Sequence, residues 1–86
     1  MARWKREETV QAQLESLLRS LCEDWGFCLP PDKARAIATA KRTEARQFAI
    51  DVLTAEGFDD PQHQTQWIRR IKRRFLQHFG ELVVEQ

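Results

Sequence analysis

The spacing of apolar residues predicts a first amphipathic helix over about residues 5–25. Apolar side chains recur there every three or four positions, which places them on one face of a helix. Gly26 is expected to end this helix in the left-handed conformation, with Phe27 covering Cys22 as in a Schellman motif. The apolar positions are Val10, Leu14, Leu17, Leu18, Leu21 and Trp25.

A second apolar stripe predicts a helix over about residues 31–56. Pro31 suits the first position of a helix, and Gly57-Phe58 repeats the ending of the first helix, with Phe58 covering Leu53. Lys41 occupies a position of the stripe, so the pattern leaves open a kink or a split near Thr43; we favour one continuous helix. The stripe consists of Ile37, Ala38, Ala45, Phe48, Ala49, Val52 and Leu53.

The third predicted helix spans about residues 61–79 and has two chemically opposite faces. Asp60 is expected to be its N-cap, Pro61 its first residue, and Gly80 its end. At about 100° per residue, the apolar side chains fall within one arc and the arginines fill the other side. The apolar arc holds Trp67, Ile68, Ile71, Phe75 and Phe79, and the basic side holds Arg69, Arg70, Arg73 and Arg74.

These elements predict an all-α fold: one domain of residues 1–86 that forms an up-down-up bundle of three helices. Residues 1–4 would be a basic arm and residues 81–86 a short tail, and no segment has a strand pattern of any strength. A chain of this size buries only roughly 60% of its unfolded surface. The protein is therefore expected to be marginally stable alone or to lean on a partner, and a homodimer is one such arrangement.

The formal net charge of +1 does not indicate a class of partner, so only local clusters of charge bear on the function. Residues 67–78 carry five cations and no acid, whereas exposed helices usually intersperse acids and bases one turn apart. In a tight antiparallel hairpin, cations of the second helix would extend this surface, so Lys41 and Arg42 join Arg69, Arg70, Arg73 and Arg74 as candidate anion-binding residues. The other cations of this second group are Lys33, Arg35 and Arg46.

Two binding functions compete with the simplest interpretation, a merely solvated charged face. The first is sequence-tolerant contact with nucleic-acid phosphates, to which the arm around Trp4 would add cations and an aromatic ring. The second is a protein-interaction module or homodimer in which Trp67, Phe75 and Phe79 are buried against another chain together with the Leu82–Val84 tail. A base-reading helix-turn-helix is disfavoured, because residues 62–66 carry no arginine at the part of the helix that reads bases.

The residue inventory favours neither an enzyme nor a metal site. The two histidines, two serines and two cysteines repeat no nucleophile–base or zinc-ligand spacing, so no catalytic residue, metal or cofactor is expected, and no small-molecule substrate is evident. Cys22 and Cys28 are too few and too close for a disulfide scaffold, and no apolar stretch resembles a signal peptide or a membrane span. The sequence therefore predicts a cytoplasmic protein with no membrane span.

Overall fold

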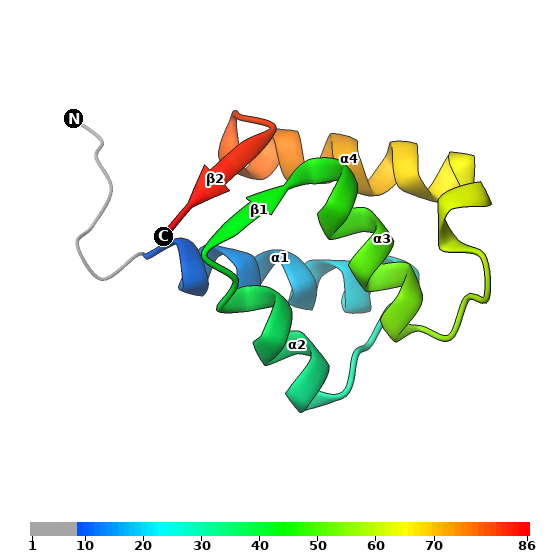
Figure 1. Ribbon diagram of the computed structural model, residues 1–86. Helices are drawn as coiled ribbons and strands as arrows, with labels where there is room; N and C mark the ends of the chain where they lie inside the picture. Colours follow the sequence, from blue (N-terminus) through cyan, green and yellow to red (C-terminus); the bar gives the residue numbers. More distant parts are fainter. Residues whose placement is uncertain (1–8) are drawn as a thin grey trace.

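The computed structural model describes residues 9–86, which form a mostly helical domain with a small sheet. The predicted helical class is confirmed, but the count of three helices and the absence of strands are wrong. The helices are α1 (Val10–Trp25), α2 (Pro31–Ala38), α3 (Ala45–Ala55) and α4 (Thr65–Phe79), with a short 3₁₀ helix, η1 (Pro61–His63), before α4 (Figure 1). The strands are β1 (Arg42–Glu44) and β2 (Val83–Glu85).

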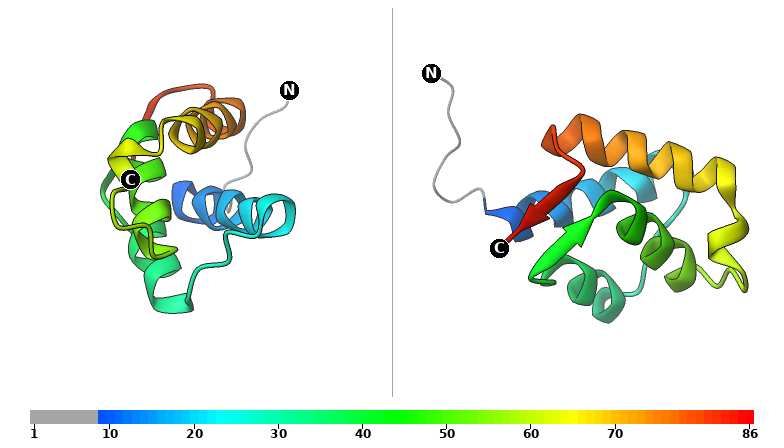
Figure 2. Two further views of the ribbon diagram at one scale, coloured as in Figure 1. Left: turned by 90° about the vertical axis from the view of Figure 1, so that its right-hand side faces the viewer. Right: turned by 45° about the horizontal axis from the view of Figure 1, so that its top comes forward.

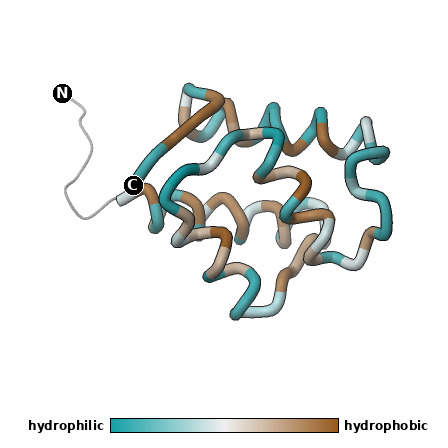
Figure 3. Tube along the Cα trace, viewed as in Figure 1, coloured by the Kyte–Doolittle hydropathy of each residue, from teal (hydrophilic) through white to brown (hydrophobic). Residues whose placement is uncertain are grey.

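The four helices enclose one hydrophobic core. α1 and α4 run in opposite directions, and α2 and α3 form a column that crosses them on one side (Figure 2, left). Hydrophobic and hydrophilic residues alternate along every helix (Figure 3), so each helix contributes one apolar face. The largest fully buried side chains are Phe48, Phe75, Leu14, Leu17, Leu21, Leu53, Ile71 and Val52.

The predicted second helix is split near Thr43, which was the alternative to a continuous helix. The chain leaves the helical conformation after α2, and β1 leads directly into α3. An unbroken helix would turn Lys41 toward the core, whereas the extended link leaves Lys41 exposed and buries Thr43. Burying an unpaired charge costs far more than the helical hydrogen bonds lost at the break.

The C-terminal residues close this break, so the tail pairs within its own chain. β2 runs antiparallel to β1 with Thr43 opposite Val84. The Gln86 side-chain amide donates hydrogen bonds of 2.7 Å to the carbonyls of Ala38 and Ala40. The carbonyls at the end of α2 thus gain donors that a continuing helix would have supplied.

The first helix begins later than predicted. α1 starts at Val10 because Thr9 is its N-cap, with the Thr9 hydroxyl accepting a 3.1 Å hydrogen bond from the amide of Ala12. The predicted basic arm, residues 1–4, lies outside the described residues.

The third helix also begins later than predicted. Pro61 starts η1 instead of α4, and the Asp60 side chain makes no capping bond. α4 begins at Thr65 and ends, as predicted, at Gly80, which has a φ of 76°.

The two Gly-Phe endings differ from each other. At Gly57 the Schellman motif is confirmed, since Phe58 donates to the Leu53 carbonyl and Gly57 to the Thr54 carbonyl. At Gly26 the helix ends with a bond from the Gly26 amide to the Cys22 carbonyl. The Phe27 ring packs against the rings of Trp67 and Phe58, and its covering of Cys22 stays a prediction.

Cys22 and Cys28 form a disulfide, so the expectation against one is wrong. The left-handed Gly26 (φ 80°) reverses the chain after α1, and this reversal brings the two Cα atoms to 4.4 Å. The cytoplasmic prediction assumed that these thiols were free, and a disulfide removes that support. Within the described part of the chain, none of the helices combines the length and the apolar character that crossing a membrane requires.

Candidate anion-binding face

α4 separates its two kinds of side chain as the helical spacing predicts. Ile68, Ile71 and Phe75 are at most 8% exposed and anchor the helix on the core. Arg69, Arg70 and Arg73 lie on the outer side and are exposed. Because the apolar anchors fix the rotation of α4 about its axis, they also fix the direction in which the arginines project.

A surface groove of about 520 Å³ runs along the outer side of α4, next to the C-terminal end of α1. The four arginines that the sequence singled out on this helix all line the groove. Its wall is completed by Trp25 of α1 and by two glutamines of α4. The lining residues are Trp25, Gln66, Arg69, Arg70, Arg73, Arg74 and Gln77.

A second groove, of about 310 Å³, lies between α4 and the start of α3. Arg69 lines both grooves, and Arg46 comes from the first turn of α3. The second groove is lined by Arg46, Gln62, Thr65, Ile68, Arg69 and Lys72. We define the basic face as the cations of the two grooves: Arg46, Arg69, Arg70, Lys72, Arg73 and Arg74.

Nearby acids compensate the charge of the basic face only at Arg74 among the described residues. The described residues that line its two grooves include no acid. In the described part of the chain, Arg74 is the one member of the six with a carboxylate within ion-pairing distance. The other five cations therefore repel one another across a shared surface, and an anion placed there would relieve that repulsion.

Two predicted site residues, Lys41 and Arg42, do not belong to this face. Neither residue lines a groove of the basic face. Arg42 instead pairs with Glu44 at 2.8 Å and with Glu85 at 3.5 Å on the small sheet. The break before α3 places this part of the chain in β1, so the predicted union of the two basic groups is wrong, and of the second group Arg46 alone reaches the basic face.

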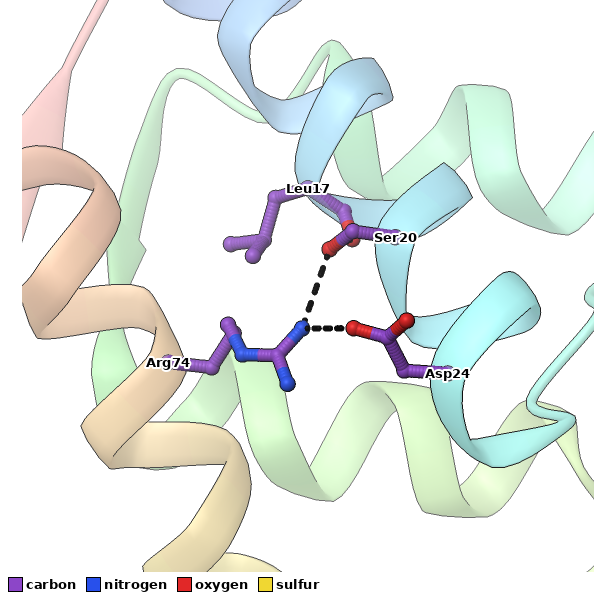
Figure 4. A network of polar contacts seen from close by, with 4 residues as sticks. All are labelled: Leu17, Ser20, Asp24 and Arg74. Atoms are coloured by element: carbon purple, nitrogen blue, oxygen red, sulfur yellow. Dashed lines mark hydrogen bonds and ion pairs between the residues drawn. The ribbon is translucent and has the colours of Figure 1, made fainter.

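Arg74 is held in place by the last turns of α1 (Figure 4). Its Nη1 donates to the carboxylate of Asp24 at 2.8 Å and to the hydroxyl of Ser20 at 3.4 Å. The guanidinium carbon lies 4.5 Å from the centre of the Trp25 ring. Among the described residues, no acceptor is bonded to its Nε or Nη2 hydrogens, so these donors remain available while the group is fixed.

The tryptophans of this region are packed rather than open. Trp25 contacts Trp67 with ring centres 5.6 Å apart, and Phe27 meets Trp67 edge-on at 4.8 Å. Arg70 lies over Trp67 at 5.2 Å, as Arg74 lies over Trp25. The indole rings therefore support arginines and helices, and their occupied faces disfavour stacking of a base.

The predicted interface residues occupy different environments. Phe75 is fully buried and packs on Phe48 and Phe79, so it belongs to the core of this chain. Trp67 and Phe79 are half-buried. Among the described residues, the exposed large apolar side chains are instead Leu76 and Leu82, with 42% and 52% of their surface accessible.

One titratable group is perturbed at the seam between α1 and α4. The His78 ring donates a 2.8 Å hydrogen bond through Nε2 to the side-chain oxygen of Gln13, which requires the tautomer protonated at Nε2 or the protonated ring. Burial lowers the pKa of His78 from 6.5, and a hydrogen bond with Gln13 opposes this shift. The described residues contain no cluster of three or more side chains suited to hold a metal ion.

Comparisons with protein-family models, curated proteins and solved structures gave no match to this chain. The chemistry of the basic face therefore carries the functional argument. Sequence reasoning missed Trp25 and Asp24 as parts of this region, because only the tertiary packing of α1 on α4 brings them there.

Proposed function

We propose that this protein binds nucleic acid through phosphate contacts made by the basic face. The observation that carries the proposal is that six cations line two neighbouring grooves. Among the described residues, five of these cations have no carboxylate partner. Five of the six are arginines, whose forked donors match phosphate oxygens.

The same geometry favours sequence-tolerant binding. Among the described residues, arginines already lie over Trp25 and Trp67, which favours contacts with the nucleic-acid backbone over stacking of a base. In a helix-turn-helix the two helices are joined by a turn of about three or four residues. Here residues 56–64, including η1, separate α3 from α4. This longer link and the position of the arginines along α4 fit backbone contact better than base readout.

The proposal is tested by fluorescence anisotropy with a labelled mixed-sequence duplex and with a single strand. We expect affinity to fall linearly with salt on logarithmic axes, with a slope of up to about −5 if all six cations contact phosphates. The variant Arg70→Glu/Arg73→Glu should lose binding. The matched control Lys33→Glu/Arg35→Glu makes the same charge change on α2, away from the basic face, and should bind more tightly than the first variant.

Two results would count against the proposal. One is the absence of binding to both nucleic acids at low salt by a folded wild-type protein. The other is an equal loss of affinity in the two charge-reversed variants, which would mean that overall charge, and not the basic face, governs the interaction.

A second candidate function rests on the exposed apolar residues near the end of α4. Leu76 and Leu82 are unusual in being large, apolar and exposed, and Phe79 between them in sequence is half-buried. Such a surface suits a protein partner or a second copy of this chain. Sedimentation velocity of the wild type and of Leu76→Ser/Leu82→Ser would reveal a dimer that depends on these side chains, with little effect of salt.

A further inference from the structure

The Cys22–Cys28 disulfide closes a loop that contains part of the wall of the basic face. The five residues between the cysteines are residues 23–27. Asp24 and Trp25 hold Arg74, and Phe27 packs on Trp67, over which Arg70 lies. The loop that the disulfide closes therefore contacts Arg74 directly and Arg70 through Trp67.

Within the described residues, few other bonds hold the segment that follows α1. The Gly26 and Phe27 amides donate to carbonyls in the last turns of α1, and the Cys28 amide donates to the Gly26 carbonyl. At the other end of this segment, the Pro30 carbonyl accepts a 2.9 Å hydrogen bond from the Ala34 amide of α2. The disulfide adds a covalent restraint on this reversal of the chain to these bonds and to the burial of Phe27.

The disulfide lies at a surface groove, through which a reductant can approach it. Cys28 is exposed and Cys22 is half-buried, and both line a groove of about 350 Å³ between α1 and α2. Arg19 and Arg35 line the same groove, together with one acid, Glu15. Neighbouring cations stabilise a thiolate, which is both the attacking and the leaving species in disulfide exchange.

We propose that Cys22–Cys28 is a thiol–disulfide exchange site whose oxidised state preorganises the basic face for anions. A thiolate of an external dithiol attacks the Sγ of Cys28, the more exposed of the two cysteines, the S–S bond breaks, and Cys22 leaves as a thiolate that takes up a proton. The second thiol of the dithiol then attacks the mixed disulfide and releases Cys28. The protein disulfide gains two electrons and two protons, and the dithiol is oxidised to a disulfide.

The expected consequence is weaker anion binding in the reduced protein, an inference that rests on the proposed function. With the disulfide closed, Asp24 and Trp25 fix Arg74 with donors free for a phosphate. With it open, the end of α1 and the following segment gain freedom, and ordering Arg74 again on binding costs entropy. We expect affinity for the mixed-sequence duplex to fall at least threefold on reduction.

The experiment uses the full chain, oxidised and then treated with dithiothreitol without denaturant. Alkylation should add two groups per molecule while the far-UV circular dichroism stays unchanged. In ¹⁵N-labelled protein, the indole signals of Trp25 and Trp67, assigned with Trp4→Phe, should move on reduction and return on reoxidation. The variant Cys22→Ser/Cys28→Ser should match the reduced protein.

Arg74→Ala provides the control for the route of regulation. Its affinity should differ little between the oxidised and reduced states, because the side chain through which the loop acts is absent. A threefold redox effect that persists in Arg74→Ala would overturn the proposed route.

The failures of the two proposals are distinguishable. Unchanged indole signals with unchanged duplex affinity would overturn the inference while leaving the proposed function in place. A disulfide that opens only when the protein unfolds would also overturn it. If the oxidised protein does not bind the duplex, the proposed function fails together with the predicted regulation, and the indole signals alone decide whether the disulfide controls the wall of the groove.

Discussion

Arg74 shows how one side chain on the basic face differs from its neighbours. It is only 25% exposed at the side chain, and it bridges α4 to α1 through Asp24, Ser20 and the Trp25 ring. Arg70 and Arg73 have no carboxylate partner among the described residues. Arg74 is thus both a packing residue and an anion-binding candidate, and Asp24 partly neutralises it.

Replacing Asp24 with Asn is expected to strengthen anion binding. The amide oxygen of Asn retains an acceptor for Arg74, while the negative charge that opposes an incoming phosphate is removed. Because Asp24 is 52% exposed at its side chain, solvent screens its charge, and we expect a gain of about twofold to fivefold in duplex affinity at low salt. Anisotropy titration measures this gain.

The control for that measurement is Asp32→Asn in the first turn of α2, which makes the same charge change away from the basic face. Equal gains in the two variants would show that Asp24 has no local role. A loss of affinity in Asp24→Asn would show that fixing Arg74 through the carboxylate outweighs removing the charge.

His78 predicts a pH dependence of stability. Burial lowers its pKa in the folded protein below 6.5, so the unfolded chain binds more protons as the pH falls through that value. The stabilisation is therefore present above about pH 6.5 and is lost as the pH falls toward the folded pKa. Urea unfolding at pH 7.5 and 5.5 should show a smaller loss of stability in His78→Gln than in the wild type. Identical losses in His78→Gln and the wild type would contradict the assignment.

At the scale of elements, the sequence predicted helices better than it predicted their interruptions. The apolar spacing located the core faces of α1, α3 and α4, because burial of a helix face follows from local periodicity. The strand pair depends on residues 42–44 meeting residues 83–85, a contact across half of the chain that no local pattern encodes. Lys41 in an apolar stripe was the one local signal of the break.

The same distinction separates the correct from the incorrect site residues. The four arginines of α4 share a helix, so their common face follows from spacing alone. Lys41 and Arg42 were placed by assuming a continuous second helix, and β1 removes them from the face. The disulfide was missed because it depends on the reversal of the chain at Gly26. The spacing predicted that the helix ends there, but not that the reversal brings Cys28 next to Cys22.

The small sheet contains a buried polar atom that predicts a stabilising substitution. Thr43 in β1 is 6% exposed, and its hydroxyl has no hydrogen-bond partner among the described residues. Thr43→Val keeps the shape and the preference for a strand while removing the unsatisfied group, so stability should rise by about 1 kcal/mol. Thr54→Val is the matched control, since the Thr54 hydroxyl is exposed and donates to the Ile50 carbonyl. The measurement is the urea midpoint at constant m-value, and a destabilised Thr43→Val would imply that the hydroxyl has a partner.

At the scale of the whole molecule, the protein is nearly neutral although one of its faces is strongly positive. The chain has 14 basic and 13 acidic residues, yet six of the basic residues form a face whose grooves no described acid lines. A polyanion that touches this face responds mainly to charges within about 10 Å at 0.1 M salt, since more distant charges are screened. The acids elsewhere on the surface therefore keep the protein near neutrality without cancelling the face.

This difference makes a prediction about pH. The sequence pI is about 7.8, so the protein loses its net positive charge between pH 7 and pH 9, and binding driven by net charge would weaken over this range. The five arginines of the basic face keep their charge, because the guanidinium group does not deprotonate below about pH 12. We therefore expect duplex affinity at pH 9.0 to remain within about threefold of its value at pH 7.0 when ionic strength is held constant. A much larger loss would mean that groups titrating between these pH values, and not the arginines of the basic face, carry the interaction.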